Sequence, residues 1–167
     1  EVFKAHNIGY FFYNGGGDSA DTCFKVSQLS EQMGYPIQAI HVPKTVDNDL
    51  PITDCCPGFG SVAKYIAVST LEASYDVRSM AKTSTKVFVI EVMGRHAGWI
   101  AAAGGLVEDH GIPVVILFPE IEFDQKKFLA RVDKLVKEHG YCTVVVSEGC
   151  HYPDGTFLAE QGTRDAF

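Results

Sequence analysis

Five short apolar runs alternate with four segments of helical spacing along the 167 residues, and this alternation is what most constrains the fold. In the last helical segment Phe128, Val132 and Leu135 recur at spacings of four and three residues. Strands that are apolar on both faces and joined by helices form a parallel sheet that is covered on both sides. We therefore expect one α/β unit over residues 1–167, an open and mostly parallel sheet with helices on both faces in Rossmann-like layers. The expected strands are 8–13, 37–42, 86–92, 113–118 and 142–147, and the expected helices are 19–33, 59–82, 96–109 and 124–139.

The composition excludes several classes of protein. A hydrophobic content of 46% is enough to bury the core of one domain. A formal net charge of -7, without any basic tract, argues against a nucleic-acid partner. No apolar run reaches the roughly 18 residues of a membrane span, and the N-terminal residues do not resemble a signal peptide. We expect a soluble, cytoplasmic protein without a membrane partner.

The cysteines support the same compartment. They are odd in number and form no C-x-x-C pair, so neither a complete disulfide set nor a zinc site is indicated. We expect five reduced thiols, as is usual in the cytoplasm. The five positions are 23, 55, 56, 142 and 150.

The stretch from Pro43 to Leu50 places two carboxylates and one ammonium group in a loop directly after an apolar run. Asp47 and Asp49 are separated by one residue, so in an extended loop both side chains lean to the same side. Phosphoryl transfer uses a base for the attacking hydroxyl, a carboxylate for Mg²⁺, and a cation such as Lys44 for the charge of the phosphate. Taken alone, the same residues are also typical of an ordinary turn.

Three glycines, Gly15 to Gly17, follow the first aromatic run and precede an expected helix whose N-cap is Asp18 or Ser19. Glycines let backbone N–H groups approach a phosphate, and the helix N-terminus adds a partial positive charge. The segment is neither a Walker A loop nor a G-x-G-x-x-G fingerprint, and a triple glycine also suits a tight turn. A phosphate cradle is the functional hypothesis.

Two more strand ends carry polar residues. Gly94 and Arg95 follow the run at 86–92, and Arg95 can bind a sugar phosphate through two parallel contacts. Glu148 follows the run at 142–147. Ligands gather at the carboxyl ends of strands in open parallel sheets, so four such clusters predict one site. The alternative is that Arg95 is a solvated residue of a helix's first turn.

These segments resemble the phosphofructokinase family, most closely its pyrophosphate-dependent branch. The resemblance covers nearly the whole chain and consists, in order, of NGGGDSADT, PKTVDNDL, EVMGRHAGW and VVVSEG. It implies a phosphofructokinase-like fold. In that family a Gly-Gly-Asp-Gly-Ser loop binds the phosphoryl donor and Mg²⁺. The implied donor-binding residues are Gly15, Gly16, Gly17, Asp18, Ser19 and Lys44.

The loop departs from the family pattern in ways that bear on the donor and the metal. Gly17 stands where the family usually has its metal-binding Asp, so coordination of Mg²⁺ from this loop is left open. Asp18 and Lys44 both stand where ATP-using members have glycine, and both favour pyrophosphate over ATP. The resemblance still implies Mg²⁺ as the cofactor, with Asp49 and Asp18 as its ligands.

The remaining roles are likewise implied by the resemblance. Asp47 is the implied base for the 1-hydroxyl of fructose 6-phosphate, Asp49 supports it, and Thr45 contacts the transferred group. Lys86 falls where ATP users often place an arginine that reaches a neighbouring subunit's site, which implies a homo-oligomer. A lysine there keeps the charge but loses the fork geometry. The implied residues for the sugar phosphate are Lys86, Met93, Gly94, Arg95 and Glu148.

Several alternatives remain open. Family members carry further segments on both sides of this region, which implies that the chain is the central part of a larger enzyme and is inactive on its own. An ATP-dependent member of the family and a non-catalytic phosphate-binding subunit of the same fold are the main alternatives. A dinucleotide dehydrogenase is more distant, because no G-x-G-x-x-G follows the first strand.

Overall fold

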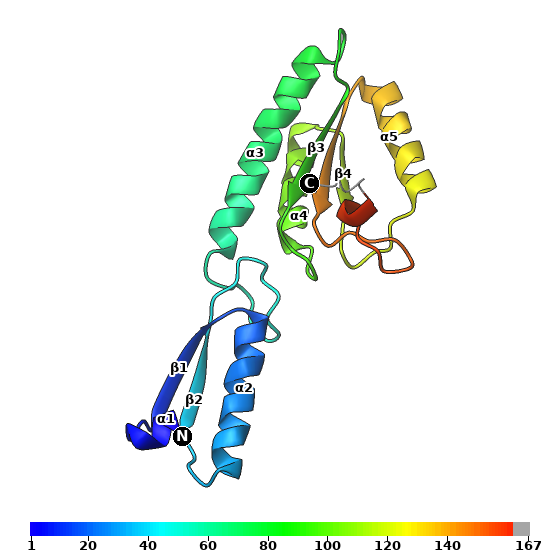
Figure 1. The fold of residues 1–167 in the computed structure, drawn as a ribbon. Coiled ribbons are helices and arrows are strands. Elements are labelled where there is room, and N and C mark those ends of the chain that lie inside the picture. The colour runs from blue at the N-terminus through cyan, green and yellow to red at the C-terminus, as the bar shows by residue number, and fades with distance from the viewer. Residues whose placement is uncertain (162–167) are drawn as a thin grey trace, which may run out of the picture. The chain divides into compact units, whose positions relative to one another are not determined.

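The computed structural model describes residues 1–161, and the chain divides into two compact units. Unit 1 comprises residues 1–59 and unit 2 begins at residue 60. Each unit has its own parallel sheet with its own helices (Figure 1). The predicted fold class, α/β with parallel strands, is confirmed, but the strands form two sheets where the sequence pattern suggested one. Apolar runs in the sequence identify the strands. Which strands pair, and in which register, depends on contacts between segments that are distant in sequence.

Unit 1 is built on two parallel strands. They pair in register from Tyr10 opposite Gln38 to Gly15 opposite Pro43, so their carboxyl ends lie at one edge. The Phe3 ring packs on the Phe11 ring with centroids 5.2 Å apart, which holds the first helix against the sheet. The elements are α1 (Val2–Ala5), β1 (Tyr10–Gly15), α2 (Gly17–Gln32) and β2 (Gln38–Pro43).

The start of α2 differs from the prediction. The N-cap is Gly16, in an extended conformation, so Asp18 and Ser19 lie inside the first turn and their prediction as N-cap was wrong. Glycine is acceptable at an N-cap because it adopts the non-helical backbone without strain. Asp18 still lies where a negative charge is favoured by the helix dipole.

Unit 2 has a three-stranded parallel sheet in the order β3-β5-β4, with β5 in the centre. Its strand and helix positions follow the predicted ones closely, except that the helix expected at 96–109 becomes a short α-helix followed by a 3₁₀ segment. The elements are α3 (Phe59–Met80), β3 (Val87–Val92), α4 (Trp99–Gly104), η1 (Gly105–His110), β4 (Val114–Leu117), α5 (Gln125–His139), β5 (Cys142–Ser147) and η2 (Leu158–Gln161).

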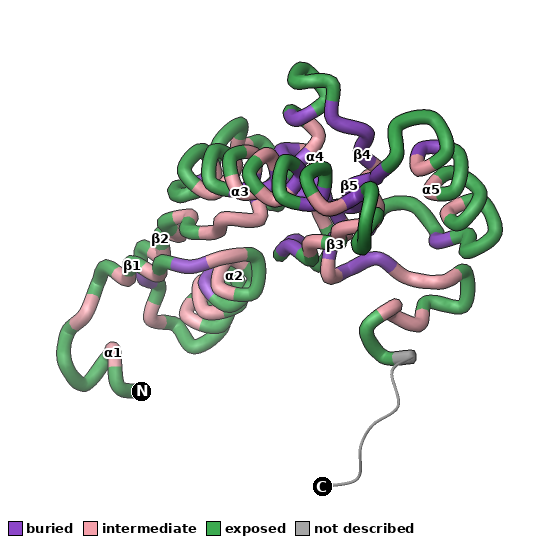
Figure 2. Tube along the Cα trace, turned by 90° about the horizontal axis from the view of Figure 1, so that it is seen from above, coloured by how far each residue is buried: buried purple, intermediate pink, exposed green. Residues whose placement is uncertain are grey.

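Both faces of this sheet are covered by helices (Figure 1). On one face of β5, Thr143 meets Ser74 of α3 through a 2.8 Å hydroxyl contact, and Val145 packs against Gly104 of α4. On the other face, Val144 lies in a cluster with Leu135 of α5. The buried parts of the chain concentrate on β5 and α4 (Figure 2). This two-sided burial explains why the sequence of β5 is apolar rather than alternating.

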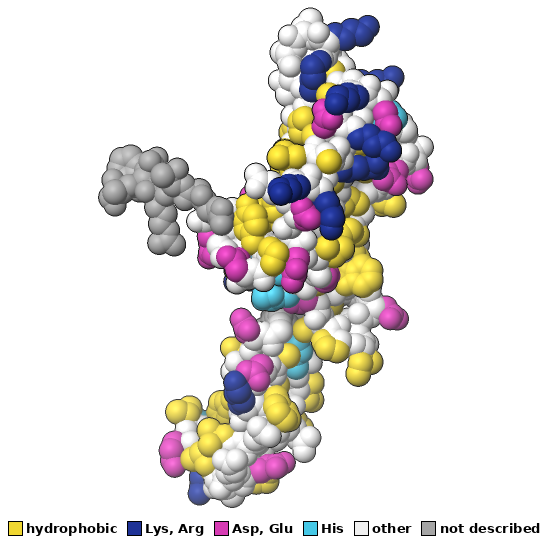
Figure 3. Space-filling view, turned by 90° about the vertical axis from the view of Figure 1, so that its right-hand side faces the viewer, with side chains coloured by type: hydrophobic (Ala, Val, Ile, Leu, Met, Phe, Trp, Pro, Cys, Tyr) yellow, Lys and Arg dark blue, Asp and Glu magenta, His cyan; other side chains and the backbone are white. Residues whose placement is uncertain are grey.

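The outer face of α5 carries charges of both signs (Figure 3). Lys137 pairs with Asp133 at 2.6 Å, and Lys134 with Glu138 at 3.8 Å. Such exposed pairs contribute little to stability, so this is an ordinary solvated helix face. Within residues 1–161 no helix combines the length and the apolar character that a membrane span requires.

Candidate functional site

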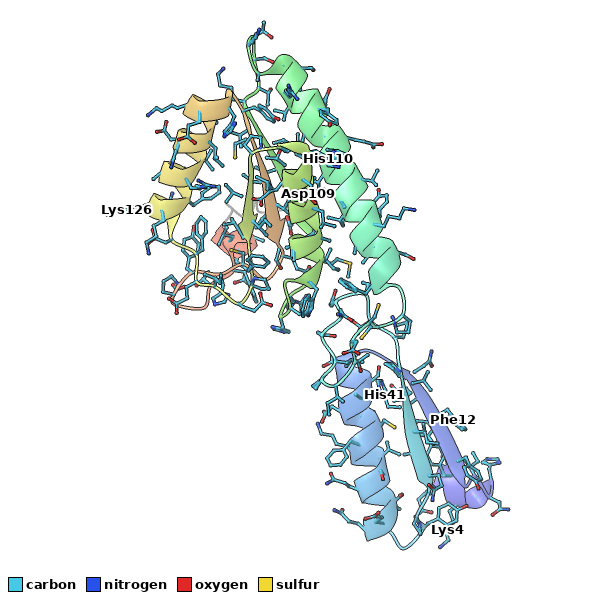
Figure 4. All side chains as sticks on the ribbon, turned by 180° about the vertical axis from the view of Figure 1, so that it is seen from behind. Lys4, Phe12, His41, Asp109, His110 and Lys126 are labelled. Carbon is cyan, nitrogen blue, oxygen red and sulfur yellow. The ribbon has the colours of Figure 1, made fainter. Side chains whose placement is uncertain are left out.

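The carboxyl edge of the unit 1 sheet brings two predicted segments together. Gly15 ends β1, and its carbonyl oxygen accepts hydrogen bonds from the Lys44 backbone N–H at 2.8 Å and from His41 Nε2 at 3.0 Å (His41 is labelled in Figure 4). The glycine segment and the segment that begins at Lys44 therefore leave the sheet side by side. This is the edge of a parallel sheet at which ligands are expected.

The glycines allow close packing at this edge. A side chain at Gly15 would collide with Ser19, because a Cβ there would lie 2.0 Å from Ser19 Oγ. Gly16 lies against Thr45, whose Cβ is 3.6 Å from the position that a Cβ of Gly16 would take. Because Gly16 has no side chain to cap α2, the amides of the first turn can bind an anion. Gly17 differs, since a Cβ there would meet nothing within 4 Å.

The loop after Lys44 is held by a residue that the sequence analysis did not single out. Asn48 is 7% exposed, and its side chain donates to the Asp54 carbonyl at 3.2 Å and accepts from the Cys56 N–H at 2.8 Å. Its backbone is left-handed, with φ of 55°, which Asn tolerates better than most residues. A buried Asn in this conformation fixes the path of the loop between Asp47 and Asp49.

The predicted polar side chains of this loop differ in exposure. Asp47 and Thr45 are half-buried, and the Thr45 hydroxyl accepts a 3.3 Å hydrogen bond from the Asp47 backbone N–H. Lys44, Asp49 and Asp18 are exposed. Residues 1–161 contain no group of three or more His, Cys, Asp or Glu side chains that could hold a metal ion. Mg²⁺ usually takes only one or two carboxylates and completes its shell with water and phosphate oxygens, so Asp18 and Asp49 remain the predicted ligands.

In unit 2 the segments that follow β3 and β5 are tied together by Ser147. This residue is 1% exposed, and its Oγ donates to the Gly94 carbonyl at 2.5 Å and accepts from the Gly149 N–H at 3.3 Å. The Glu148 N–H also donates to the Val92 carbonyl at 2.8 Å. The structure thus brings Gly94 and Glu148, predicted from separate motifs, to one place.

Two glycines are required by this arrangement. Gly94 has φ of 121°, and a Cβ there would lie 2.4 Å from the Ala97 carbonyl oxygen. A Cβ at Gly149 would lie 1.9 Å from the Arg95 carbonyl oxygen, so the two backbones touch. Met93 and Arg95 are exposed, whereas Glu148 is half-buried. The exposed Arg95 side chain therefore projects from a rigidly held backbone.

Lys86 lies apart from these residues. It precedes β3 at the amino end of the strand, and its Nζ donates to the Ala81 carbonyl oxygen at 2.6 Å. A strand of this length separates its two ends by about 20 Å. Within unit 2, Lys86 is thus not at the edge where Gly94 and Glu148 meet.

The predicted site residues divide between the units. Unit 1 contains those predicted for the donor, the metal and the base, and unit 2 contains those predicted for the sugar phosphate. The unit 1 residues are Gly15, Gly16, Gly17, Asp18, Ser19, Lys44, Thr45, Asp47 and Asp49, and the unit 2 residues are Lys86, Met93, Gly94, Arg95 and Glu148.

Comparison with known proteins establishes the family. The model of the phosphofructokinase family matches residues 1–166. The chain belongs to the phosphofructokinase family. It is 74% identical over 169 residues to the pyrophosphate–fructose 6-phosphate 1-phosphotransferase of Methylococcus capsulatus, a match that covers 100% of the chain and 40% of that protein. It is 72% identical to the protein of the same name from Halomonas elongata, with the same coverage of 100% and 40%.

A solved structure agrees with this assignment. The pyrophosphate-dependent phosphofructokinase from Nitrosospira multiformis superimposes with a TM-score of 0.86 at 78% identity, over 95% of this chain and 41% of that one. The chain thus spans about 40% of the length of the curated phosphofructokinases that it matches.

Proposed function

We propose that the protein carrying this chain transfers a phosphoryl group from pyrophosphate to the 1-hydroxyl of fructose 6-phosphate, giving fructose 1,6-bisphosphate in glycolysis. The names of its close relatives support this reaction. The structural observation that carries it is the meeting of the glycine turn with the Lys44–Thr45 segment at one sheet edge. Phosphoryl transfer depends mainly on positioning and on neutralising charge, and that edge offers backbone amides and a cation for both.

Pyrophosphate is the proposed donor at this edge. The amides of Gly16, Gly17 and the first turn of α2 would bind its oxygens, and the exposed Lys44 would neutralise part of its charge. Mg²⁺, when bound to Asp18 and Asp49, supplies further charge neutralisation to the phosphate oxygens. A Cβ at Gly17 would meet nothing within 4 Å. The atoms of this chain therefore do not obstruct a donor bound beside Gly17.

Asp47 is the proposed base. Its half-buried carboxylate would take the proton of the attacking hydroxyl, with Thr45 at the transferred phosphoryl group. The hydrogen bond from the Asp47 backbone N–H to the Thr45 hydroxyl joins the two residues. Asn48 holds the loop that presents both, so it acts as a positioning residue.

Unit 2 is the proposed binder of the sugar phosphate. Arg95 would bind an anionic group, and Glu148 would accept hydrogen bonds from sugar hydroxyls. The backbone of Met93 and Gly94 would line the same site. Lys86, at the opposite end of β3, would serve a neighbouring subunit's site, which requires a homo-oligomer. We place the protein in the cytoplasm, where five cysteines without disulfide partners stay reduced.

A non-catalytic phosphate-binding subunit is the second candidate. It is favoured by Gly17, which supplies no carboxylate where the family usually has its metal-binding Asp. Such a subunit would bind pyrophosphate without turning it over. An ATP-dependent enzyme is less well supported, because Asp18 and Lys44 occupy positions that ATP users keep as glycine.

The test is a donor assay on the full-length protein. Formation of fructose 1,6-bisphosphate from fructose 6-phosphate is measured with pyrophosphate or ATP, each with Mg²⁺. We expect turnover with pyrophosphate and a kcat/KM for ATP lower by about 100-fold or more, the discrimination typical of a site that excludes one substrate. Equal turnover with ATP would favour the ATP-dependent alternative, and binding without turnover would favour the non-catalytic subunit.

A further inference from the structure

His41 of β2 contacts the glycine turn, Gly15 to Gly17, at the carboxyl edge of the unit 1 sheet. The odd-numbered residues of β1 and β2 are less exposed than the even-numbered ones, and Gly15 lies against Ser19 of α2. His41 therefore lies on the face of the sheet that α2 covers. From this half-buried position its Nε2 reaches the Gly15 carbonyl oxygen at 3.0 Å, although the two residues are 26 positions apart (Figure 4). A carbonyl oxygen only accepts hydrogen bonds, so Nε2 is the nitrogen that carries the proton.

The Gly15 carbonyl oxygen accepts two hydrogen bonds. Besides the bond from His41, the Lys44 backbone N–H donates to it at 2.8 Å and continues the pairing of Gly15 with Pro43. One bond comes from the backbone of the neighbouring segment and the other from a side chain on the face of the sheet. The peptide group between Gly15 and Gly16 cannot turn over without breaking both bonds.

The direction of this carbonyl sets the direction of the Gly16 N–H. Both groups belong to one planar trans peptide unit, in which C=O and N–H point in opposite directions. Gly16 is the N-cap of α2, and backbone N–H groups at such a position can bind an anion. With the carbonyl bound to His41 and Lys44, the N–H points away from them. A peptide group turned over would present its carbonyl oxygen to a phosphate and repel it.

We propose that His41 is a positioning residue for pyrophosphate, because its bond to Gly15 fixes the peptide group whose N–H binds the donor. This inference rests on the proposed function. A group that is already ordered in the free protein need not be ordered when the ligand arrives, which lowers the free-energy cost of binding. The sequence around His41 carries no sign of this role, because the partner lies on another strand.

Calorimetric titration of the full-length protein with pyrophosphate and Mg²⁺ tests this role without relying on turnover. Gln places its side-chain N–H₂ near the position of the histidine Nε2, whereas the shorter Asn does not reach it. We expect His41→Asn to weaken pyrophosphate binding about five- to tenfold, comparable with the loss of one hydrogen bond, and His41→Gln to stay within about twofold of the unaltered protein. His41→Ser, which is shorter still, should behave as His41→Asn.

His6→Asn is the matched control, because His6 is an exposed histidine of the same unit, and it should bind pyrophosphate as the unaltered protein does. If His41→Asn and His41→Ser bind as tightly as the unaltered protein, or if His41→Gln loses as much affinity as they do, the bond to Gly15 does not position the donor and the proposal is overturned.

Steady-state kinetics separates positioning from a general loss of structure. For His41→Asn we expect the KM for pyrophosphate to rise about five- to tenfold while the KM for fructose 6-phosphate changes by less than about twofold. An equal rise in both KM values would contradict the assignment. If pyrophosphate binding differs between the Asn and Gln variants but the unaltered protein shows no turnover, the proposed reaction fails while the role of His41 stands. No binding of pyrophosphate by the unaltered protein would overturn both.

Discussion

Asn48 lies between two acidic residues, and its buried side chain holds the loop that carries both of them. Its carboxamide satisfies the Asp54 carbonyl and the Cys56 N–H, and its backbone between Asp47 and Asp49 is left-handed. Removing the carboxamide would leave a buried backbone N–H without a partner, which costs about 1–3 kcal/mol. The loop geometry therefore depends on a residue that need not touch any substrate.

Asp47 is the residue on which the proposed chemistry depends most. Asp47→Ser in the full-length protein should lower kcat by roughly 10² to 10⁴, the usual contribution of a general base, with little change in substrate binding. Steady-state kinetics with both substrates measures this. Asp49→Asn is the comparison, and it should weaken the dependence on Mg²⁺ instead. A loss confined to KM would show that Asp47 binds substrate and does not act as the base.

The cysteines differ in exposure, and this gives a prediction about reactivity. Cys55 is exposed, whereas the other four are buried. Burial raises the pKa of the Cys142 thiol to about 11 and also raises the pKa of Cys150, so at pH near 8 both remain protonated and unreactive. Titration of the 167-residue chain with a chromogenic disulfide reagent should show one fast thiol in the folded state and five after denaturation. Loss of the fast phase in Cys55→Ser completes the test, and two or more fast thiols would contradict the burial pattern.

At the scale of elements, the local pattern located strands well. The run predicted at 142–147 is β5 itself, and the run at 37–42 is displaced from β2 by one residue. Alternation and apolar character are local properties, so they can be read from the chain without knowing the fold. The division of the strands between two sheets could not be found in this way, because pairing depends on residues far apart in sequence.

The same distinction applies to the candidate site. Motifs identified the turns after the strands, but the bond from Ser147 to Gly94 joins residues 53 positions apart and has no local signal. The helix expected from residue 96 begins only at Trp99, because Gly94 and Gly98 are held in a turn by close contacts. Tertiary contacts of this kind at glycines prevent a helix from forming where the spacing of the apolar residues predicts one. A serine at the end of a buried strand, just before Glu-Gly, was the available clue to Ser147.

Ser147 links the ends of β3 and β5, so its removal should affect both stability and substrate binding. Ser147→Ala leaves the Gly94 carbonyl and the Gly149 N–H without their buried partner, and we expect a loss of about 1–3 kcal/mol in the free energy of unfolding. Urea denaturation of the full-length protein measures this loss. The KM for fructose 6-phosphate should rise while that for pyrophosphate does not.

Ser84→Ala is the matched control for that substitution, because Ser84 is exposed and its removal should change neither quantity. If Ser147→Ala and Ser84→Ala have the same stability, the buried link carries no net free energy. If Ser147→Ala instead raises both KM values equally, the link supports the fold as a whole and does not position the acceptor segment.

At the scale of the whole molecule, the residues proposed for the two substrates belong to different units. Those for the donor lie in unit 1 and those for the sugar phosphate lie in unit 2. Each unit has its own sheet and its own helices. Donor preference should therefore be open to change by substitutions in unit 1 alone, without loss of the acceptor residues.

Asp18→Gly/Lys44→Gly in the full-length protein tests this. A carboxylate at residue 18 repels an additional phosphate of ATP, and Lys44 occupies space beside it, so the double variant should accept ATP more readily. We expect the ratio of kcat/KM for pyrophosphate to that for ATP to fall about tenfold or more, which corresponds to about 1.4 kcal/mol. Both side chains are exposed, so folding should be little affected.

Asp21→Gly, which removes an exposed carboxylate from the next turn of α2, is the control and should leave the ratio unchanged. An unchanged ratio in the double variant would mean that neither charge discriminates between the donors, and that selection acts on the nucleoside and not on its phosphates.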